Sequence, residues 1–387
     1  MRVLVLSAEV GESHAAMARA LACDLERRHP GATVTVVNDF SVLGPRLGRL
    51  LSRGFRYHLG TVQWSYDLAY LFFTRVGPAR RAGELALYAL GGSALAATVA
   101  GHAPDVVVST YPVLNPVLAR LRAAGRLQCP VVAVVGPLAG LGFWVQPGID
   151  LHVLNYAEAL PAVRRRAGSA RARPVRPLVR EEFFAPVPRA AARSALGIAA
   201  DRGVVIVSGG GWGAGDLSGA IDACVAVPGV HVIAVAGRNA LLRRTLAARF
   251  GDGDAVTVLG FTDRMRELLC AANVLVTATA GLSCLEARLC GCPTVCYGFP
   301  VGHVRDNTRA LQRHGLARIA TTPAELSRQV ENLLAEARPQ SCPALGPLPS
   351  AAELVLGLGP GGAAAGDGGL PSPASPTGAL TAEPGPP

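Results

Sequence analysis

The stretch that most constrains the fold is Val204 to Asp216, VVIVSGGGWGAGD, where a strand pattern runs into five glycines within seven residues. Four consecutive apolar residues indicate a strand that is covered on both faces. The glycines allow positive φ angles and a close approach to a ligand, and a helix pattern begins at Leu217. Because free backbone N–H groups and a helix dipole meet in such a turn, the stretch predicts an anion site. Glycine-rich turns are also common packing devices, and this spacing matches neither the dinucleotide fingerprint nor the Walker loop.

The composition indicates two domains with a basic surface. The chain of 387 residues exceeds the size of one typical core. Its net charge of +10 comes from arginine alone, because the sequence contains no lysine. A basic surface favours anionic partners such as nucleotides, nucleic acid or lipid headgroups. The nine cysteines lack zinc spacing and the start of the chain lacks a secretory pattern, so we expect reduced thiols and a cytoplasmic protein.

Alternating strand and helix patterns predict an α/β fold with two doubly wound parallel sheets. The strands expected in the first half are Val3–Leu6, Thr33–Val37, Asp105–Ser109, Pro130–Val135 and Leu151–Leu154. Those expected in the second half are Val204–Ser208, His231–Ala236, Val256–Leu259, Val274–Ala278 and Thr294–Tyr297. We therefore expect a first domain at 1–162, an exposed interdomain crossing rich in arginine and proline at 163–185, a second domain at 186–337 and a disordered tail at 338–387.

Two segments of the first half depart from the alternation of strand and helix patterns. Pro45 to Arg81 interleaves arginine with aromatic residues. One interpretation is a pair of mobile helices that lie in a membrane interface and meet anionic lipid. The other is an inserted helical pair whose aromatic residues fill the domain core. Leu85 to Ala100 is apolar but shorter than the roughly 20 residues that span a bilayer, so we expect a buried helix there.

Polar or glycine-rich residues follow four strands of the second half, at Gly209–Gly213, Gly237–Asn239, Gly260–Asp263 and Thr279–Ser283. Open parallel sheets bind ligands beyond the carboxyl ends of their strands. The four turns therefore predict one binding site at one edge of the second sheet.

The order and spacing of several motifs resemble those of glycosyltransferases with the GT-B architecture. These motifs are VSGGGWGAGD, VAGRNALL, VLGFTDRMRELLCAANVLVTATAGLSCLEARLCGCPTV, FPVGHVRDNTRAL and, at the crossing, RPLVREEFF. The group they resemble contains monogalactosyldiacylglycerol synthases and processive diacylglycerol glucosyltransferases, and the peptidoglycan UDP-GlcNAc transferase is its relative. The resemblance covers about Met1 to Ala337 and implies two Rossmann-like domains that face a cleft, the first for the acceptor and the second for a UDP-sugar.

The resemblance implies a donor site in the second domain. Glu286 matches the acid that binds the ribose hydroxyls of UDP, while the alternative is a helix-surface glutamate that the dipole stabilises. The helix start at Gly281 and the turn at Gly209 would meet the diphosphate, and the loop from Phe261 would hold the uracil. The full set implied is Gly209, Gly210, Gly211, Trp212, Arg238, Asn239, Phe261, Thr262, Met265, Ala280, Gly281, Leu282, Ser283, Glu286, His303 and Asn307.

Two parts of this donor set leave alternatives open. Arg238 and Asn239 end a strand, and a mere turn is the competing interpretation. His303 and Asn307 fall where the family places a glutamine and an asparagine that bind the donor sugar. Because His303 departs from that pattern, the identity of the sugar stays open.

The acceptor side matches the family less well. Its first turn reads Val-Gly-Glu-Ser-His and ends at His14, where the family has three glycines before the histidine. His14 is the first candidate for a catalytic base and Glu12 the second, while a helix cap is the alternative for His14. After Val135 the family usually carries Thr-Asp and then a histidine before the tryptophan. Here Gly136, Pro137 and Leu141 occupy that region, which indicates altered acceptor chemistry or weakened activity.

The sequence therefore predicts transfer of a hexose or N-acetylhexosamine from a UDP-sugar to a diacylglycerol-like lipid or another hydrophobic acceptor. The resemblance implies an inverting reaction without a metal or other cofactor. We expect a cytoplasmic enzyme of glycolipid biosynthesis with peripheral contact to the inner face of an anionic membrane, and no nucleic-acid partner. Two alternatives stay open: a degenerate homologue that binds nucleotide sugar or lipid without turnover, and an enzyme similar to UDP-GlcNAc 2-epimerases.

Overall fold

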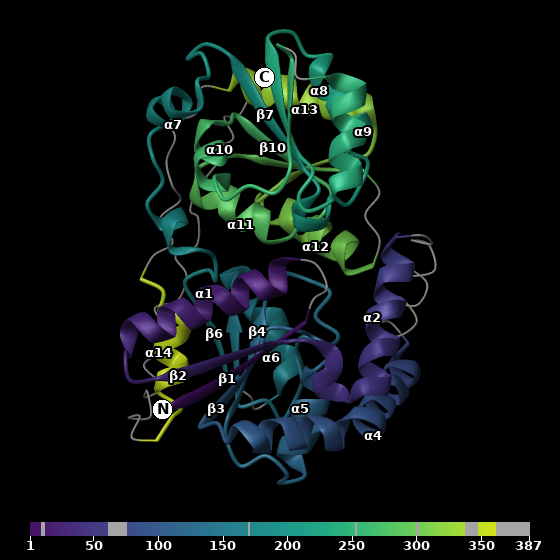
Figure 1. Ribbon diagram of the computed structural model, residues 1–387, viewed down its shortest axis with the longest axis vertical. Coiled ribbons are helices and arrows are strands. Elements are labelled where there is room, and N and C mark those ends of the chain that lie inside the picture. Colours follow the sequence, from purple (N-terminus) through teal and green to yellow (C-terminus); the bar gives the residue numbers. More distant parts are fainter. Residues whose placement is uncertain are drawn as a thin grey trace, which may run out of the picture.

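The computed structural model describes residues 1–8, 12–60, 76–168, 171–251, 254–298, 302–336 and 347–360, without the side chains of residues 55–60 and 303. Two units lie one above the other, and each is built on a six-stranded parallel sheet flanked by helices (Figure 1). The predicted α/β fold with two doubly wound sheets is confirmed.

The first sheet has the strand order β2-β1-β3-β4-β5-β6. Its strands are β1 (Arg2–Ser7), β2 (Thr33–Asn38), β3 (Val106–Ser109), β4 (Val131–Val135), β5 (Leu151–Leu154) and β6 (Arg171–Pro174). Its helices are α1 (Glu12–Arg28), η1 (Phe40–Leu43), α2 (Pro45–Gly60), α4 (Gly77–His102), α5 (Asn115–Ala123), η2 (Ala157–Ala159) and α6 (Leu160–Ala167). Every residue of β3, β4 and β5 is buried, as expected of parallel strands that helices cover on both faces.

The second sheet has the strand order β12-β11-β10-β7-β8-β9. Its strands are β7 (Gly203–Ser208), β8 (Val230–Val235), β9 (Val256–Leu259), β10 (Val274–Thr277), β11 (Thr294–Tyr297) and β12 (Arg318–Ala320). The helices from the connection onward are η3 (Glu181–Phe184), α7 (Arg189–Leu196), η4 (Gly210–Trp212), α8 (Leu217–Val225), α9 (Ala240–Phe250), α10 (Met265–Ala271), α11 (Leu282–Leu289), α12 (Gly302–Arg313) and α13 (Pro323–Ala335). The strand β7 lies between β10 and β8 at the centre of the sheet. The glycine-rich turn that follows β7 therefore lies at the middle of the edge formed by the carboxyl ends of the strands.

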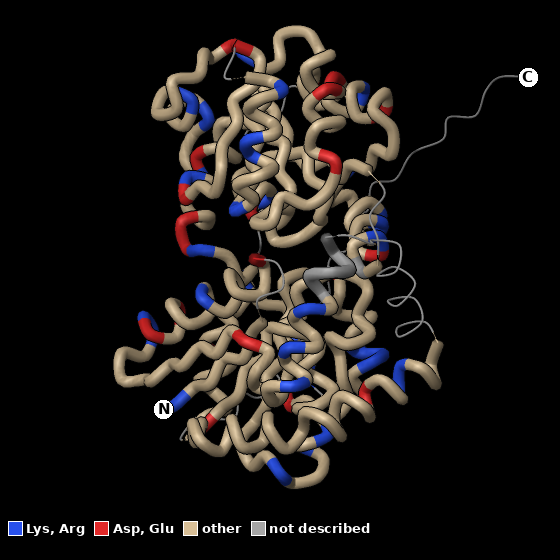
Figure 2. The backbone as a smooth tube through the Cα atoms, turned by 45° about the vertical axis from the view of Figure 1, so that its right-hand side comes forward, with Lys and Arg blue, Asp and Glu red and all other residues tan. Residues whose placement is uncertain are grey.

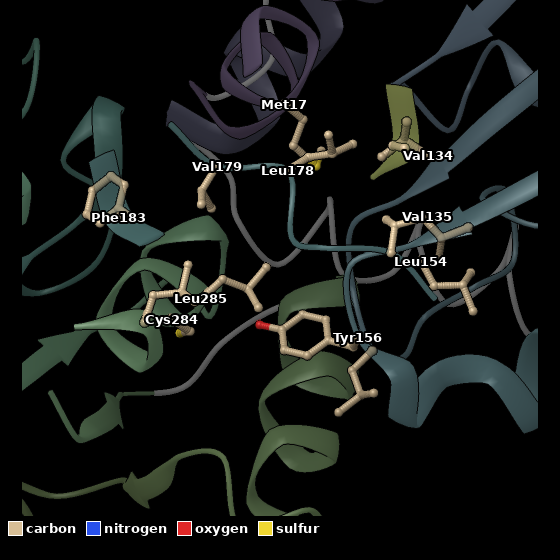
Figure 3. Packing of buried hydrophobic residues seen from close by; sticks show 14 of the residues in the cluster. Met17, Val134, Val135, Leu154, Tyr156, Leu178, Val179, Phe183, Cys284 and Leu285 are labelled. Atoms are coloured by element: carbon tan, nitrogen blue, oxygen red, sulfur yellow. The ribbon is translucent and has the colours of Figure 1, made fainter. Parts of the chain in front are cut away.

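An apolar cluster joins the two units. Met17 of α1 and Tyr156, which follows β5, contribute from the first unit, and Leu285 of α11 contributes from the second (Figure 3). Val179 and Phe183, from the segment that connects the units, are buried in the same cluster. The connecting segment therefore forms part of the interdomain core.

The expectation of an exposed crossing at 163–185 is wrong. Residues 163–167 complete α6, and Arg171 to Pro174 form β6, which pairs with β5 at the edge of the first sheet. An edge strand tolerates arginine and proline because one of its sides makes no ladder hydrogen bonds. Val175, which comes next, is buried.

The expectation of a wholly disordered tail at 338–387 is also wrong. The helix α14 (Ala351–Leu356) lies beside α1 (Figure 1). Ala352 and Val355 are fully buried, and Arg28 of α1 forms an ion pair with Glu353. The short apolar run at the start of α14 stands within a segment dominated by Pro, Gly and Ala, which conceals it. Residues 337–346 and 361–387 lie outside the described part of the chain.

The helix α4 is longer and less buried than the buried helix expected at Leu85–Ala100. Leu95 and Val99 are buried, but Leu85 and Leu90 are 51% and 69% exposed. By length and composition alone, α4 is the one helix among the described residues that could cross a membrane, and 22% of its most apolar window is buried. The aromatic segment that precedes it, at residues 61–75, lies outside the described residues.

Charged residues are mixed over the surface of both units. In the view of Figure 2, basic positions of the described chain are dispersed and acidic positions lie among them. Several arginines are paired within the fold, as in the ion pairs of Arg122 with Asp150 and of Arg249 with Asp222. The arginine excess therefore does not by itself define a single binding face.

Candidate active site

One cavity of about 1600 Å³ lies between the two units. Loops that follow β7, β8, β9 and β10 line it from the second unit, and α1 with residues that follow β3, β4 and β5 lines it from the first. The predicted site residues that line it are Glu12, His14, Gly209, Gly210, Gly211, Trp212, Arg238, Phe261, Thr262, Met265, Ala280, Gly281, Leu282, Ser283, Glu286 and Asn307. The structure thus brings both predicted bases and most of the predicted donor set into one cavity.

Glycine shapes the turn after β7. Gly210 and Gly213 have φ angles of 69° and 65°, a region that favours glycine. A Cβ added to Gly209 would lie 2.5 Å from backbone atoms of Ala214, and one added to Gly237 would lie 2.5 Å from the carbonyl oxygen of Gly210. Because these neighbours are backbone, they cannot swing aside as a side chain could. The two turns therefore pack directly on each other, and bare backbone forms this part of the cavity wall.

Gly211 also brings the two units into close contact, because a Cβ there would lie 2.5 Å from the Cβ of Glu12 on α1. We expect Gly211→Ala to push α1 from the turn and to lower the free energy of unfolding by about 1–2 kcal/mol, as overpacking does. Thermal unfolding of the purified variant measures this loss. The second substitution Glu12→Gly removes the clashing atom, so a double variant as unstable as Gly211→Ala alone would contradict the contact.

The helix α11 begins at the cavity wall. Its N-cap is Gly281, and the residue before it, Ala280, has a φ of 44°, where residues other than glycine are rare. The first N–H groups of a helix have no partners within it, and they carry the positive end of its dipole. Since Gly281, Leu282 and Ser283 line the cavity, this helix start is suited to bind an anionic group there.

Glu286 lies one turn into α11 and lines the same cavity. Burial raises the pKa of its carboxyl group from 4.5 to about 7; the charge of Arg180 opposes the rise and that of Glu182 adds to it. The group therefore changes its charge near neutral pH, a property that is common among residues of binding and catalytic sites.

Arg238 joins the two sides of the cavity. Its guanidinium lies 3.8 Å from the centroid of the Phe261 ring, and its Nε lies 3.6 Å from Oε2 of Glu12. The neighbouring Asn239 does not line the cavity: its side chain accepts a hydrogen bond from the N–H of Leu242 and caps α9. For Asn239 the donor-site prediction is therefore replaced by the alternative of a structural turn.

His14 is held by its neighbours in the first unit. Its Nδ1 lies 2.8 Å from the carbonyl oxygen of Thr110, which can only accept, so Nδ1 donates this hydrogen bond. In the neutral imidazole the lone pair is then on Nε2. The ring stacks on Trp144, with centroids 5.4 Å apart, and meets the edge of Tyr111 at 4.9 Å. The contact with Thr110 favours the tautomer of the neutral ring that a general base acting through Nε2 requires.

Glu12 is less suited to that role. Its Oε1 lies 2.6 Å from Nη2 of Arg19, and its Oε2 faces Arg238 across the cleft. Both carboxylate oxygens therefore lie against guanidinium groups, a position that joins α1 to the second unit. Of the two predicted bases, the geometry favours His14.

Asn307 of α12 has a different environment from the one predicted for a sugar ligand. It is 4% exposed, its Oδ1 accepts from the N–H groups of Leu138 and Ala139, and its Nδ2 donates to the carbonyl oxygen of Ala280. Its amide is therefore bonded to backbone of both units. The side chain of His303, the other predicted sugar ligand, lies outside the described residues.

The loop after β4 begins at Gly136, which packs beside Met17 and Trp144. A Cβ on Gly136 would lie 3.2 Å from Cε of Met17 and 3.4 Å from the Trp144 ring. A Cβ at this position would need a small shift of the flexible end of Met17 and would touch the tryptophan that stacks on His14. Gly136 therefore lies next to the aromatic ring beside the candidate base.

A further part of the cavity wall is apolar. It consists of residues of α2, α4 and the loops after β3 and β4, among them Leu47, Leu50, Leu51, Gly54, Leu87, Leu90, Val113 and Phe143. The sequence indicated lipid contact for Pro45 to Arg81 but did not single out these residues. The spacing of the leucines along α2, three and four residues apart, is the signal that could have indicated one apolar helix face. The cavity therefore joins the glycine turns and the start of α11 in the second unit to an apolar wall of α2 and α4 in the first.

Comparison with known proteins finds a different family match for each unit. Residues 14–168 match the family described as monogalactosyldiacylglycerol (MGDG) synthase, and residues 216–336 match the family described as glycosyl transferases group 1. A processive diacylglycerol beta-glucosyltransferase of Bacillus subtilis is 24% identical over 347 residues, which is 87% of each chain.

Two solved structures share the fold. The spinosyn rhamnosyltransferase SpnG has a TM-score of 0.58 at 16% identity, with 92% of this chain and 100% of that chain covered. Anabaena HepE in complex with UDP-glucose has a TM-score of 0.50 at 17% identity, with 87% of this chain and 90% of that chain covered.

The fold, the site and these matches define the protein as a glycosyltransferase of the GT-B architecture. Within that class it is similar to the monogalactosyldiacylglycerol synthases and the processive diacylglycerol glucosyltransferases, as the sequence motifs predict. The predictions of a GT-B fold and of a hexosyltransferase are thereby confirmed.

Proposed function

We propose that the protein transfers a hexose from a UDP-sugar to the hydroxyl group of a diacylglycerol-like lipid. The observation that carries this proposal is the continuity of the cavity, which joins the glycine turns and the start of α11 to the apolar faces of α2 and α4. A nucleotide sugar suits the first part, and acyl chains suit the second. The names of the relatives, which specify diacylglycerol as the acceptor, and the UDP-glucose bound to HepE point to the same pair of substrates.

The donor would bind to the second unit. The N–H groups at the start of α11 and the glycine turn after β7 would face the diphosphate, and the helix dipole would stabilise its charge as it leaves. Glu286 would accept hydrogen bonds from two ribose hydroxyls, and Phe261 with Thr262 would border the base. In this arrangement positioning and fixed dipoles supply the stabilisation of the leaving group.

The reaction would be a single displacement at the anomeric carbon. Nε2 of His14 would take the proton of the acceptor hydroxyl as the oxygen forms a bond to carbon and the bond to the diphosphate breaks. Attack from the face opposite to the leaving group inverts the configuration. We propose that no metal takes part, because α11 offers N–H groups to the diphosphate; among the described residues, no three His, Cys, Asp or Glu gather as metal ligands.

The acceptor chemistry implies a protein that works at a lipid surface. The cavity wall formed by α2 and α4 continues to outward-facing leucines, since Leu50 and Leu90 are 67% and 69% exposed. We propose peripheral contact of this part of the first unit with an anionic membrane from the cytoplasmic side. Binding to vesicles with and without anionic lipid tests this proposal, and equal binding to both would contradict the charge requirement.

A product assay tests the proposed reaction. The purified protein is incubated with UDP-glucose, UDP-galactose or UDP-GlcNAc and with diacylglycerol in mixed micelles, and products are identified by mass spectrometry. We expect a glycosyl diacylglycerol with release of one UDP per product, at a rate unchanged by EDTA. Binding of UDP without any product would favour a homologue that does not turn over, and an epimerised nucleotide sugar without UDP release would favour an epimerase.

A further inference from the structure

Asn307 makes contacts that the proposed donor chemistry does not require. It lies on α12 of the second unit, yet its Oδ1 is 2.7 Å from the backbone nitrogen of Leu138 and 3.3 Å from that of Ala139, both in the first unit. Its Nδ2 lies 2.7 Å from the carbonyl oxygen of Ala280. With 4% of its surface exposed, one side chain joins two loops that belong to different units.

The loop that Asn307 holds belongs to the acceptor side. Gly136, Pro137 and Gly140 line the cavity, and the same loop continues to Phe143 and Trp144, which line it too. Trp144 stacks on His14, and its carbonyl oxygen accepts from the side chain of Asn115 at 2.8 Å. The loop is therefore anchored at both ends: Asn115 fixes the end that carries Trp144, and Asn307 fixes the start.

The other partner of Asn307 belongs to the donor side. Ala280 immediately precedes the N-cap of α11, and its φ of 44° is strained for a residue with a side chain. A hydrogen bond to its carbonyl helps to hold that conformation and so the direction in which α11 begins. Through one amide group, the position of the donor helix and that of the acceptor loop depend on each other.

We propose that Asn307 is a positioning residue that completes the acceptor site from the donor unit. The first unit alone leaves the N–H groups of Leu138 and Ala139 without the acceptor that Asn307 supplies, so the start of the loop gains these hydrogen bonds only when the two units meet. The loop in turn supports Trp144 and the base that stacks on it. The acceptor role of the loop rests on the proposed function, but the hydrogen bonds between the units do not depend on it.

Substituting Asn307 by alanine and by leucine tests the proposal. Both remove the amide, and leucine keeps most of the volume, so an effect shared by both reports the hydrogen bonds. We expect the KM for diacylglycerol to rise by about tenfold and kcat to fall, while calorimetry shows UDP and UDP-sugar binding within about twofold of wild type. Arg309→Ala, an exposed change on the same helix, is the matched control and is expected to leave all values unchanged.

A second measurement does not depend on activity. Hydrogen exchange of the peptide that contains Leu138 and Ala139 is expected to speed up by about tenfold in both Asn307 variants, because their N–H groups lose the bond that protects them. If the protein transfers no sugar, faster exchange at this loop still supports the interdomain bond. Unchanged exchange would overturn the proposal, and so would a loss of UDP-sugar binding with the KM for the acceptor unaltered, the result expected of a residue that contacts the donor sugar.

Discussion

Replacing His14 by alanine is expected to lower kcat for sugar transfer by about a thousandfold, the middle of the range for loss of a general base. The reason is the hydrogen bond from Nδ1 to the carbonyl of Thr110, which in the neutral ring places the lone pair on Nε2. Binding of UDP is expected to stay within about twofold, since His14 belongs to the wall opposite the donor loops. Initial rates with the lipid acceptor and calorimetry with UDP measure the two effects.

The chain offers a matched control for His14. In His102, Nδ1 also lies 2.8 Å from a backbone carbonyl oxygen, that of Thr98, but the residue is exposed at the end of α4 and does not line the cavity. His102→Ala is expected to leave kcat unchanged. Glu12→Gln keeps the size of the other candidate base and is expected to lower kcat by less than about tenfold. A larger loss in Glu12→Gln than in His14→Ala would reverse the assignment of the base.

The sequence predicted those elements of the fold that carry a clear pattern within their own residues. Strands such as β4 and β7 are runs of valine bounded by polar or glycine-rich turns, so their positions follow from the pattern alone. β6 and α14 were missed for a common reason. Each is held by an element elsewhere in the chain, β5 for the strand and α1 for the helix. The arginine and proline of β6, and the residues rich in proline, glycine and alanine around α14, are typical of loops.

In the candidate site, too, local motifs were predictive and contacts between distant residues were not. The motifs around Gly209 and Glu286 are local, and the residues they predict lie together in one cavity. What they could not reveal are contacts between the units. The pairing of Glu12 with Arg238, and the bonding of Asn307 to Leu138, join residues far apart in the sequence. Such contacts depend on how the two sheets are placed, which no periodicity within one element records.

The second large effect is expected from substituting Glu286, the acidic residue of the proposed donor site. Glu286→Gln is expected to weaken UDP binding by about tenfold to a hundredfold at pH 8, because a carboxylate forms stronger hydrogen bonds with ribose hydroxyls than a neutral amide does. Calorimetry measures the affinity. Glu331→Gln, an exposed change on α13, is the control for removal of a negative charge and is expected to have no effect.

The pH dependence follows from the raised pKa of Glu286, which is about 7. Because the carboxylate is the form that binds, the affinity of the wild type for UDP is expected to rise as the pH increases from 6 to 8 and to level off above the pKa. The phosphate of UDP also titrates, so the informative quantity is the ratio of the two affinities, wild type over Glu286→Gln. A ratio that stays constant over this range would contradict a ribose contact through the ionised carboxylate.

Glu286→Gln is expected to weaken UDP binding but to stabilise the folded protein at pH 8. In the folded protein burial raises the pKa of Glu286 from 4.5 to about 7, so the neutral form is favoured there relative to the unfolded chain. Its cost is absent below the unfolded value, grows as the pH rises from 4.5 to 7, and reaches at most about 3 kcal/mol above that. Glu286→Gln should therefore unfold at a higher temperature than wild type at pH 8 and at nearly the same temperature at pH 4.5. A variant that binds UDP more weakly yet is more stable indicates a carboxylate kept for its ligand, whereas a variant that loses both would indicate a structural role for Glu286.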